Sequence, residues 1–445
     1  MTKYTKEEIL AMAEEENVEF IRLQFTDVFG NLKNMAITVP QLEKALDNEI
    51  LFDGSAIDGF ARVAASDMYF HPDPDTWAIL PWRPQHGKVA RMLCDVCTTD
   101  HKPFAGDPRQ VLKRAIARAA ELGYTFHVGP ECEFFLFRTD EDGQPTTQTE
   151  EQERAGYFDI SPIDGGENAR RDMVLTLEEM GFEIRSSHHE IAPAQHEIDF
   201  LHDEALKTAD NIMTFKMAVK TIARKHGQHA TFMPKPKYGN NGSGMHLNIS
   251  LHRNGENIFR DDAGPDGISR EARWFIGGIM RHIKGMTAIL NPLVNSYKRL
   301  VPGFDAPVWI SWSGECKGTL LGIPADRGPR ARVELRSPDS AANPYLALAV
   351  VLRAGLDGIE NQIEPPAQIK GHIGEKSAEE LLNEGVELLP TTLMEAIREL
   401  EKDELVKETL GEHIAPLYIR AKKKEFLEYS AQVSQWEVDR YLFKY

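Results

Sequence analysis

The stretch that decides the fold is His127-Val128-Gly129-Pro130-Glu131-Cys132-Glu133-Phe134-Phe135-Leu136-Phe137, which places two carboxylates inside an apolar run. Side chains alternate along a β-strand, so a strand over 124–138 would put Glu131 and Glu133 on one face, about 7 Å apart. Two like charges in that arrangement repel unless a cation lies between them. The stretch therefore predicts a cation-binding strand. The alternative is an edge strand whose polar face lies in water.

Length and charge limit the classes of protein to consider. A chain of 445 residues exceeds what one hydrophobic core usually organises, so two or more domains are expected. The formal net charge of −18 argues against nucleic acid or an anionic membrane as partner, since either would need a basic face. Because no run approaches about 18 apolar residues and the N-terminus lacks a signal-peptide pattern, we expect a cytoplasmic location.

The four cysteines are too few to form a disulfide framework in a chain of this length. Cys94 and Cys97 form a Cys-x-x-Cys motif, but no second pair accompanies it. Zinc binding is therefore the weaker interpretation, and two half-buried strand thiols are expected instead.

The domain boundary is predicted between residues 103 and 104. Residues 1–103 combine an acidic amphipathic helix with alternating strands, and a proline-rich stretch over 71–84 carries the chain across the surface. Asp107-Pro108 is a helix start, with aspartate as N-cap and proline at the first helical position, so a helix should run from there to near Gly123.

The second domain, 104–445, is expected to be α+β. Polar and apolar residues alternate in several of its strands, which favours an antiparallel sheet with one functional face over a parallel one. Residues 343–445 read as mostly helical. The predicted strands are 124–138, two within 182–200, 229–233 and 244–251, and the predicted helices are 168–180, 203–226 and 269–290.

Three further segments also place polar residues on one strand face. In the first, 187–197, two carboxylates flank a proline-containing turn. In the second, 240–250, one strand face carries His246, Asn248 and Ser250. In the third, 330–336, one strand face carries Arg332, Glu334 and Arg336. Taken singly, each has an ordinary structural explanation, such as a satisfied core histidine or a surface ladder of ion pairs. Four such segments in one chain indicate a common site.

The residue types of these segments indicate which ions such a site would bind. Together they offer five carboxylates and one imidazole but no thiolate, the ligands that Mg²⁺ or Mn²⁺ prefers over structural zinc. Two ions that share six protein ligands would keep positions open for phosphate oxygens and water.

These segments also carry a resemblance to a known family. Phe52-Asp53-Gly54-Ser55, Gly129 to Glu133, the His188 to Glu197 turn, Asn241 to His246, Asn295 to Gly303 and Arg332 to Ser337 together resemble type I bacterial glutamine synthetase, in the alpha branch of Gram-positive bacteria. The resemblance implies an N-terminal β-grasp domain and a catalytic domain of the glutamine-synthetase/guanidino-kinase fold with a curved antiparallel sheet. It also implies a dodecamer of two hexameric rings with active sites between subunits.

The resemblance assigns roles residue by residue. Glu133, Glu190 and Glu197 would hold one metal ion, and Glu131, His246 and Glu334 the other. The predicted substrate-binding residues are Asn241, Gly242, Arg299 and Arg336; the nucleotide-binding residues are Asn248, Ser250 and Arg332; the catalytic residues are Asp53, Asp305, Arg299, Lys317 and Arg336. Asp53 would bind ammonium from the adjacent subunit. Arg62 would sense glutamine, with a nitrogen-regulatory transcription factor as candidate partner.

The implied reaction needs ATP as substrate and two or more Mg²⁺ or Mn²⁺ ions. A carboxylate is a poor electrophile, so the γ-carboxylate of glutamate first takes the terminal phosphate of ATP. Ammonia then displaces that phosphate, and a carboxylate base must deprotonate the incoming ammonium. Metal ions and arginines stabilise the charge that develops in both steps.

The chain departs from the family pattern at four positions. Asp305 stands where the family has glutamate as base, Lys317 and Gly322 stand where it has arginine, and Ala56 where it has serine. Loss of one charge-assisted hydrogen bond could slow phosphoryl transfer roughly tenfold to a hundredfold. Glutamine synthesis is the first prediction, with reduced or altered activity. The alternatives are ligation of glutamate to a larger amine, a catalytically weak regulatory homologue, and, less well fitting, a guanidino kinase.

Overall fold

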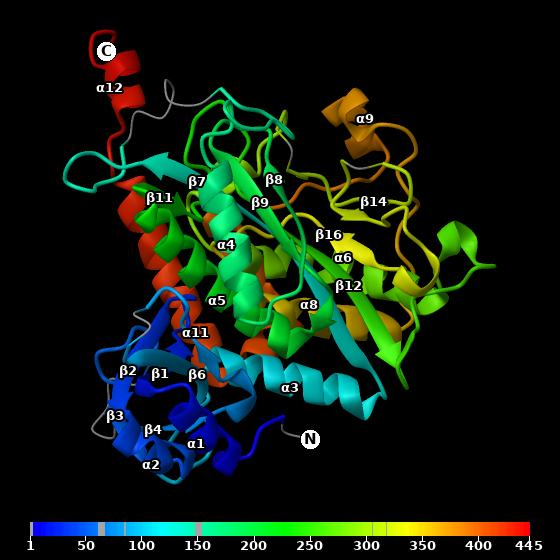
Figure 1. Cartoon of the computed structure of the whole chain (residues 1–445). Coiled ribbons are helices and arrows are strands. Elements are labelled where there is room, and N and C mark those ends of the chain that lie inside the picture. Colours follow the sequence, from blue (N-terminus) through cyan, green and yellow to red (C-terminus); the bar gives the residue numbers. More distant parts are fainter. Residues whose placement is uncertain (1–2, 61–66, 84–85, 147–153, 305, 317) are drawn as a thin grey trace.

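The computed structural model describes residues 3–60, 67–83, 86–146, 154–304, 306–316 and 318–445. A small N-terminal sheet lies beside a larger body built on a second, curved sheet (Figure 1). Helices and strands are both abundant, so the predicted α+β class is confirmed.

The N-terminal domain is a mixed sheet with strand order β2-β1-β6-β4-β3. β1 and β6 pair in parallel, whereas β1 and β2 form an antiparallel hairpin. Helix α1 is fixed at its start by a capping box between Thr5 and Glu8. The bounds are α1 Lys6–Glu15, β1 Val18–Thr26, β2 Leu32–Thr38, η1 Val39–Gln41, α2 Leu42–Leu46, β3 Ile50–Asp53, β4 Asp67–Pro72, η2 Pro74–Thr76, β5 Ala78–Ile79 and β6 Lys88–Cys97.

Two details of this domain differ from the expectations. The proline-rich stretch is not irregular throughout, because β4 runs through His71 and ends at Pro72. Cys94 and Cys97 both lie in β6 as expected, but they are buried rather than half-buried. Burial raises the pKa of both thiols, that of Cys97 to about 11, which makes them unreactive packing residues.

Helix α3, Pro108–Glu121, follows the N-terminal domain. It begins as predicted, with the Asp107 side chain accepting a hydrogen bond from the Arg109 amide. Arg109 then joins the two parts of the chain: it donates to Asp95 of β6 at 2.8 Å and, at 2.8 and 3.0 Å, to Asp210 of helix α5, Ala205–Lys225.

The larger sheet has strand order β14-β15-β16-β12-β7-β9-β8. Its pairs are antiparallel as predicted, except that β14 and β15 run parallel. β7 lies between β12 and β9, so the edge-strand interpretation of the Glu131–Glu133 stretch is wrong. The bounds are β7 Thr125–Arg138, β8 Ile184–His189, β9 Gln195–Phe200, β10 Asp203–Glu204, β11 Gln228–Thr231, β12 Met245–Arg253, β13 Glu256–Asn257, β14 Trp312–Ser313, β15 Leu321–Gly322 and β16 Val333–Leu335.

Helices pack against this sheet and form the main core with it. Helices α6 and α8 lie in close contact at Gly278. A Cβ added there would lie only 2.1 Å from the Ala354 carbonyl oxygen, so the contact requires glycine. The bounds are α4 Glu167–Glu179, α5 Ala205–Lys225, η3 Pro265–Gly267, α6 Arg270–Leu290, α7 Ser296–Arg299, η4 Gly328–Arg330, α8 Pro344–Glu360, η5 Ile373–Glu375, α9 Ala378–Asn383, α10 Leu393–Lys402, α11 Glu404–Ser430 and α12 Gln435–Tyr441.

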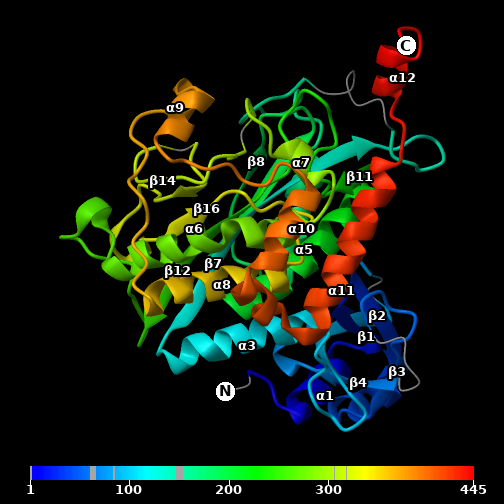
Figure 2. The same cartoon turned by 180° about the vertical axis from the view of Figure 1, so that it is seen from behind.

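The C-terminal helix α12 projects from the body at the end opposite the N-terminal domain (Figure 2). Trp436 of this helix is 59% exposed, and Phe443, which follows the helix, is 94% exposed. Among the residues that the structure describes, no helix has the length and apolar character needed to cross a membrane.

Candidate active site

The register of four neighbouring strands builds the site. Glu131 of β7 lies opposite His246 of β12 on one side and Asp199 of β9 on the other. Glu133 lies opposite Glu197. Glu334 of β16 lies opposite Asn248, so it reaches the same face from the far side of β12. Carboxylates placed directly across a sheet repel, so this face is arranged to receive cations.

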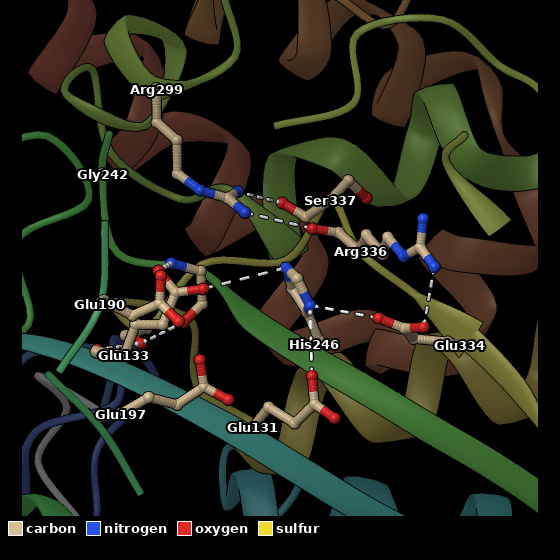
Figure 3. A network of polar contacts seen from close by, with 12 residues as sticks. Glu131, Glu133, Glu190, Glu197, Gly242, His246, Arg299, Glu334, Arg336 and Ser337 are labelled. Atoms are coloured by element: carbon tan, nitrogen blue, oxygen red, sulfur yellow. Dashed lines mark hydrogen bonds and ion pairs between the residues drawn. The ribbon is translucent and has the colours of Figure 1, made fainter. Parts of the chain in front are cut away.

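One cluster joins Glu131, His246 and Glu334 (Figure 3). Nδ1 of His246 lies 3.4 Å from Oε2 of Glu131 and 3.2 Å from Oε1 of Glu334. Burial opposes a charge on this imidazole, but hydrogen bonds with the two carboxylates raise the pKa of His246 to about 10. Burial also opposes the Glu334 charge, yet His246 and Arg336 lower the pKa of Glu334. A cation bound here would displace a proton from His246.

A second cluster joins Glu190 and Glu197 with His188. Nε2 of His188 lies 2.9 Å from Oε1 of Glu190 and 3.8 Å from Oε2 of Glu197. Burial and the neighbouring carboxylates of Asp199 and Glu133 raise the pKa of Glu197 well above its usual range. An uncompensated carboxylate in that position would be destabilising, so the cluster fits a cation.

Glu133 lies between the two clusters. Its Oε2 accepts hydrogen bonds from Nε2 of Gln195 at 2.8 Å and from the Gly244 amide at 2.9 Å, and its Oε1 is 4.0 Å from Nε2 of His246. The family resemblance implies that Glu133, Glu190 and Glu197 hold one ion. In the structure, the ligand atoms that lie close together around Glu190 and Glu197 include one from His188. The chemistry of the donor set, oxygen with imidazole, suits hard divalent ions in both clusters.

A third group of possible ligands, Asp164, His189 and His196, is buried next to the site. Nη1 of Arg170 lies 2.8 Å from Oδ2 of Asp164 and 2.8 Å from Nδ1 of His196. A guanidinium therefore takes the place that a metal ion would need, and this group supports the β8–β9 hairpin instead.

A cavity of about 660 Å³ opens over the two clusters. Its polar lining includes the carboxylates and both Arg185 and Arg336. Its aromatic and apolar lining consists of Tyr157, Phe158, Ile191, Phe304, Ala306 and Pro307. The cavity can therefore hold a charged ligand and shield part of it from water.

The predicted substrate-binding residues differ in their access to this cavity. Arg336 lines it, donates to Oε2 of Glu334 at 3.0 Å, and has a buried Nη1 that finds no hydrogen-bond partner among the described residues. Arg299 is only 2% exposed and donates to the backbone carbonyls of Ser337 and Arg336 at 2.7 and 3.1 Å. Arg299 thus fixes the backbone from which Arg336 extends.

Asn241 and Gly242 lie in the loop before β12. The Gly242 carbonyl accepts a hydrogen bond from Nε2 of Gln195 at 3.0 Å. A Cβ at this position would lie 2.0 Å from the Pro234 carbonyl oxygen, so only glycine fits. This close approach fixes the loop against the β9 end of the site.

Two of the three predicted nucleotide-binding residues are linked by hydrogen bonds to Glu131. Arg332 donates from Nε to Oδ1 of Asn248 at 2.8 Å, and Asn248 donates from Nδ2 to Oε1 of Glu131 at 3.1 Å. Ser250 is buried on the same strand, 3.1 Å from Nε2 of His252. None of the three is among the described residues that line the cavity, so their role in binding nucleotide stays a prediction.

Three of the predicted residues are not placed by the structure, and a fourth lies away from the cavity. Asp305, Lys317 and Arg62 lie outside the described residues. Asp53 ends β3 in the N-terminal domain, where its Oδ1 accepts from the Ser55 amide at 2.8 Å, and it does not line the cavity. Its predicted contribution to a neighbouring subunit's site stays a prediction, as do the other assigned roles.

Sequence reasoning missed four residues of the site: His188, Gln195, Asp199 and Arg185. Gln195 and Asp199 each lie two residues from Glu197, so strand alternation could have placed them on its face. His188 was quoted with its motif but given no role. Arg185 gave no signal, because its partners come from β7 and β9 through long-range pairing.

The fold and the site define a class: a two-domain α+β protein with a β-grasp domain and, on a curved sheet, two clusters of carboxylate and imidazole groups that could hold metal ions. Within it, the chain belongs to the glutamine synthetase family. The family models "Glutamine synthetase, beta-Grasp domain" and "Glutamine synthetase, catalytic domain" match residues 17–99 and 105–441. The resemblance to type I enzymes of Gram-positive bacteria is confirmed by the relatives that follow.

Curated relatives match over the whole chain. A glutamine synthetase of Clostridium saccharobutylicum is 57% identical over 100% of both chains, and one of Staphylococcus aureus strain Mu50 is 53% identical over 99% of both. Among solved structures, a GmaS/ADP complex is 34% identical with a TM-score of 0.87, covering 97% of this chain and 99% of that chain.

Proposed function

We propose that this enzyme joins ammonia to the γ-carboxylate of glutamate, with ATP as the phosphate donor, and releases glutamine. The observation that carries this function is the convergence of Glu131, Glu133, Glu190, Glu197, His246 and Glu334 on one cavity that also holds arginines. Full-length identity of 57% and 53% to glutamine synthetases supports it. The related GmaS structure is a complex with ADP, which supports a nucleotide as substrate.

The residues divide the work along the cavity. Glu131, His246 and Glu334 would hold one ion next to Asn248, Ser250 and Arg332, and Glu133, Glu190 and Glu197 would hold another at the opposite end. When bound, such ions stabilise charge on the transferred phosphoryl group and orient it. Arg336 offers its unpartnered Nη1 to the oxygens of the γ-carboxylate or phosphoryl group. Asp305 would deprotonate ammonium, and Asp53 of a neighbouring subunit would bind it.

A divalent ion of the Mg²⁺ or Mn²⁺ type fits the donor set, because five carboxylates and one imidazole are hard or intermediate ligands. A cytoplasmic location is proposed as well. All four cysteines are free and buried, as is usual for proteins of a reducing compartment.

Turnover with a panel of acceptor amines tests the function. Purified enzyme with ATP, glutamate and Mg²⁺ or Mn²⁺ is expected to release phosphate fastest with ammonium, at a rate of roughly 1 to 10³ per second. Mass spectrometry should identify glutamine as the product. The same mixture without metal is the control and should show no turnover.

Faster phosphate release with methylamine or a larger amine than with ammonium would contradict the proposal. The 57% and 53% identity to glutamine synthetases does not favour that alternative. Absence of turnover with every amine would instead support a regulatory homologue. We propose that Lys317 and Gly322 alter how phosphate is held, and Asp305 how ammonium is deprotonated, without abolishing ligation.

We propose that the enzyme assembles as a dodecamer of two hexameric rings. The exposed apolar residues at the C-terminal end support an assembly that covers them: Val433, Trp436, Leu442, Phe443 and Tyr445 are 75, 59, 64, 94 and 91% exposed. Patches of this kind on a folded chain mark interaction sites. A nitrogen-regulatory transcription factor remains a proposed further partner, with Arg62 as the glutamine-sensing residue.

Sedimentation of the full chain and of a chain ending at Ser434 tests this assembly. The full chain is expected to sediment as a particle of twelve chains, and the shortened chain, which lacks α12, as smaller particles. A full chain that sediments as a monomer or dimer at micromolar concentration would contradict the proposal.

A further inference from the structure

Arg185 reaches the metal-ligand clusters from the edge strand β8. One of its terminal nitrogens, Nη2, donates to Oε1 of Glu131 and to Oδ2 of Asp199, both at 3.0 Å. The side chain is nevertheless 42% exposed and lines the same cavity as the carboxylates. Arg185 is therefore held at the site and still open to a ligand.

Arg185 and Arg336 stand at the two ends of one row of alternating charges. The row runs Arg185, Glu131, His246, Glu334, Arg336, with successive distances of 3.0, 3.4, 3.2 and 3.0 Å (Figure 3 shows it from Glu131 onward). An ion held by Glu131, His246 and Glu334 would lie in the middle of this row. Phosphate oxygens that bind such an ion would then have a guanidinium on either side.

The unused donors of Arg185 fit that position. A guanidinium has five N–H groups, and only those on Nη2 have partners among the residues that the structure describes. If Arg185 served only to neutralise the charge of buried Asp199, its three further N–H donors would have no role at the cavity. Planar, bidentate donation is how arginine usually binds phosphate.

A second cation stands close to Arg185. Arg332 reaches the same Glu131 through Asn248, and its pKa is lowered by burial and then by the charge of Arg185. The two guanidinium groups repel each other, although Glu131, Asp199 and Asp326 lie beside them. An anion bound between them would relieve that repulsion.

We propose that Arg185 binds the phosphate chain of the nucleotide, opposite Arg336, and so supplies a phosphate contact in a site where Gly322 offers none. The inference rests on the proposed function, since it takes ATP as the substrate.

Calorimetric binding of ADP and of adenosine at saturating Mg²⁺ tests this role in Arg185→Gln and Arg185→Lys. The Kd of ADP is expected to rise about tenfold to a hundredfold in Arg185→Gln, while that of adenosine changes less than about twofold. Arg185→Lys should recover part of the loss, because lysine keeps the charge without the fork. Arg171→Gln is the matched control, as it removes the same charge from a 69% exposed side chain on α4.

Two results would overturn the proposal. One is an unchanged Kd of ADP in Arg185→Gln. The other is an equal rise in the Kd of ADP and of adenosine, which would show a structural effect on the whole nucleotide site. Binding is measured without glutamate or ammonium. A wild-type enzyme that binds ADP but forms no glutamine would therefore refute the ligase function, while the comparison of the Arg185 variants would still decide the phosphate contact.

Discussion

Glutamine formation is expected to fall by at least about 10³-fold when Glu197 is replaced by glutamine, and one of two bound metal ions is expected to be lost. Glutamine has nearly the shape of glutamate but cannot supply the negative oxygen that a hard divalent ion needs. A lost ion removes several kcal/mol of stabilisation of transition-state charge. Mn²⁺ content per chain by elemental analysis and turnover with ammonium measure the two effects.

Burial makes Glu197 an informative position for this test. Its pKa is raised because it is desolvated and lies beside Asp199 and Glu133, so the neutral amide should be well tolerated by the fold. Glu178→Gln is the control, because Glu178 is exposed on α4, which packs next to β8. A Glu197→Gln enzyme that keeps both ions and at least a tenth of its turnover would refute the assignment of Glu197.

Period-two patterns explain why much of the site could be predicted from the sequence. Glu131 and Glu133 are two residues apart, as are His246 and Asn248, and each pair lies on one face as strand geometry requires. Local signals also worked for α3, where Asp107 and Pro108 mark the start. These features depend on neighbours in sequence, which one chain shows directly.

Register between strands is what the sequence could not supply. Asp199 faces Glu131 and Glu197 faces Glu133 only because β9 pairs with β7 in that alignment. Without the pairing, Asp199 was not distinguished from an ordinary strand residue, and Arg185 not from a surface arginine. The edge-strand alternative arose for the same reason, since position within a sheet is a long-range property.

Burial on both faces hid the bounds of the central strand of the N-terminal domain, although a strand was expected around Cys94 and Cys97. In β6 nearly every residue from Val89 to Cys97 is buried, so polar and apolar residues do not alternate. β6 lies between β1 and β4 and packs on both sides. A continuous apolar run of this kind does not show its length or direction from periodicity alone.

The space that Gly322 leaves is filled by Arg336. A Cβ at residue 322 would lie 2.6 Å from Nη2 and 3.1 Å from Cζ of Arg336. The guanidinium cannot move away freely, because its side chain is only 12% exposed and Nη2 is bonded to Glu334. The family pattern has arginine at this position. In this chain, the observed position of the Arg336 guanidinium depends on the absence of a side chain at Gly322.

Gly322→Arg is therefore expected to lower glutamine formation, on the order of 10²-fold, instead of restoring a stronger enzyme. The new side chain would push Arg336 off Glu334 and place a second cation against it, so the donor aimed at developing charge would be misplaced. Initial rates at saturating ATP, glutamate and ammonium measure the effect. Phosphate release without ammonium should fall in parallel if the phosphoryl step is the one affected.

Gly322→Ala separates the two causes of that loss. Alanine adds only the Cβ that meets Arg336, so a loss with alanine comes from displacement, whereas a loss confined to arginine comes from added charge. Gly371→Ala is the matched control for substitution itself: at that exposed glycine no atom lies within 4 Å of a Cβ, although its φ of +73° makes alanine strained there.

Faster glutamine formation by Gly322→Arg would show that the glycine is a simple loss and that Arg336 has room to move. A fall with both Gly322 variants would show that the close packing of Arg336 on Gly322 is how this site holds phosphate.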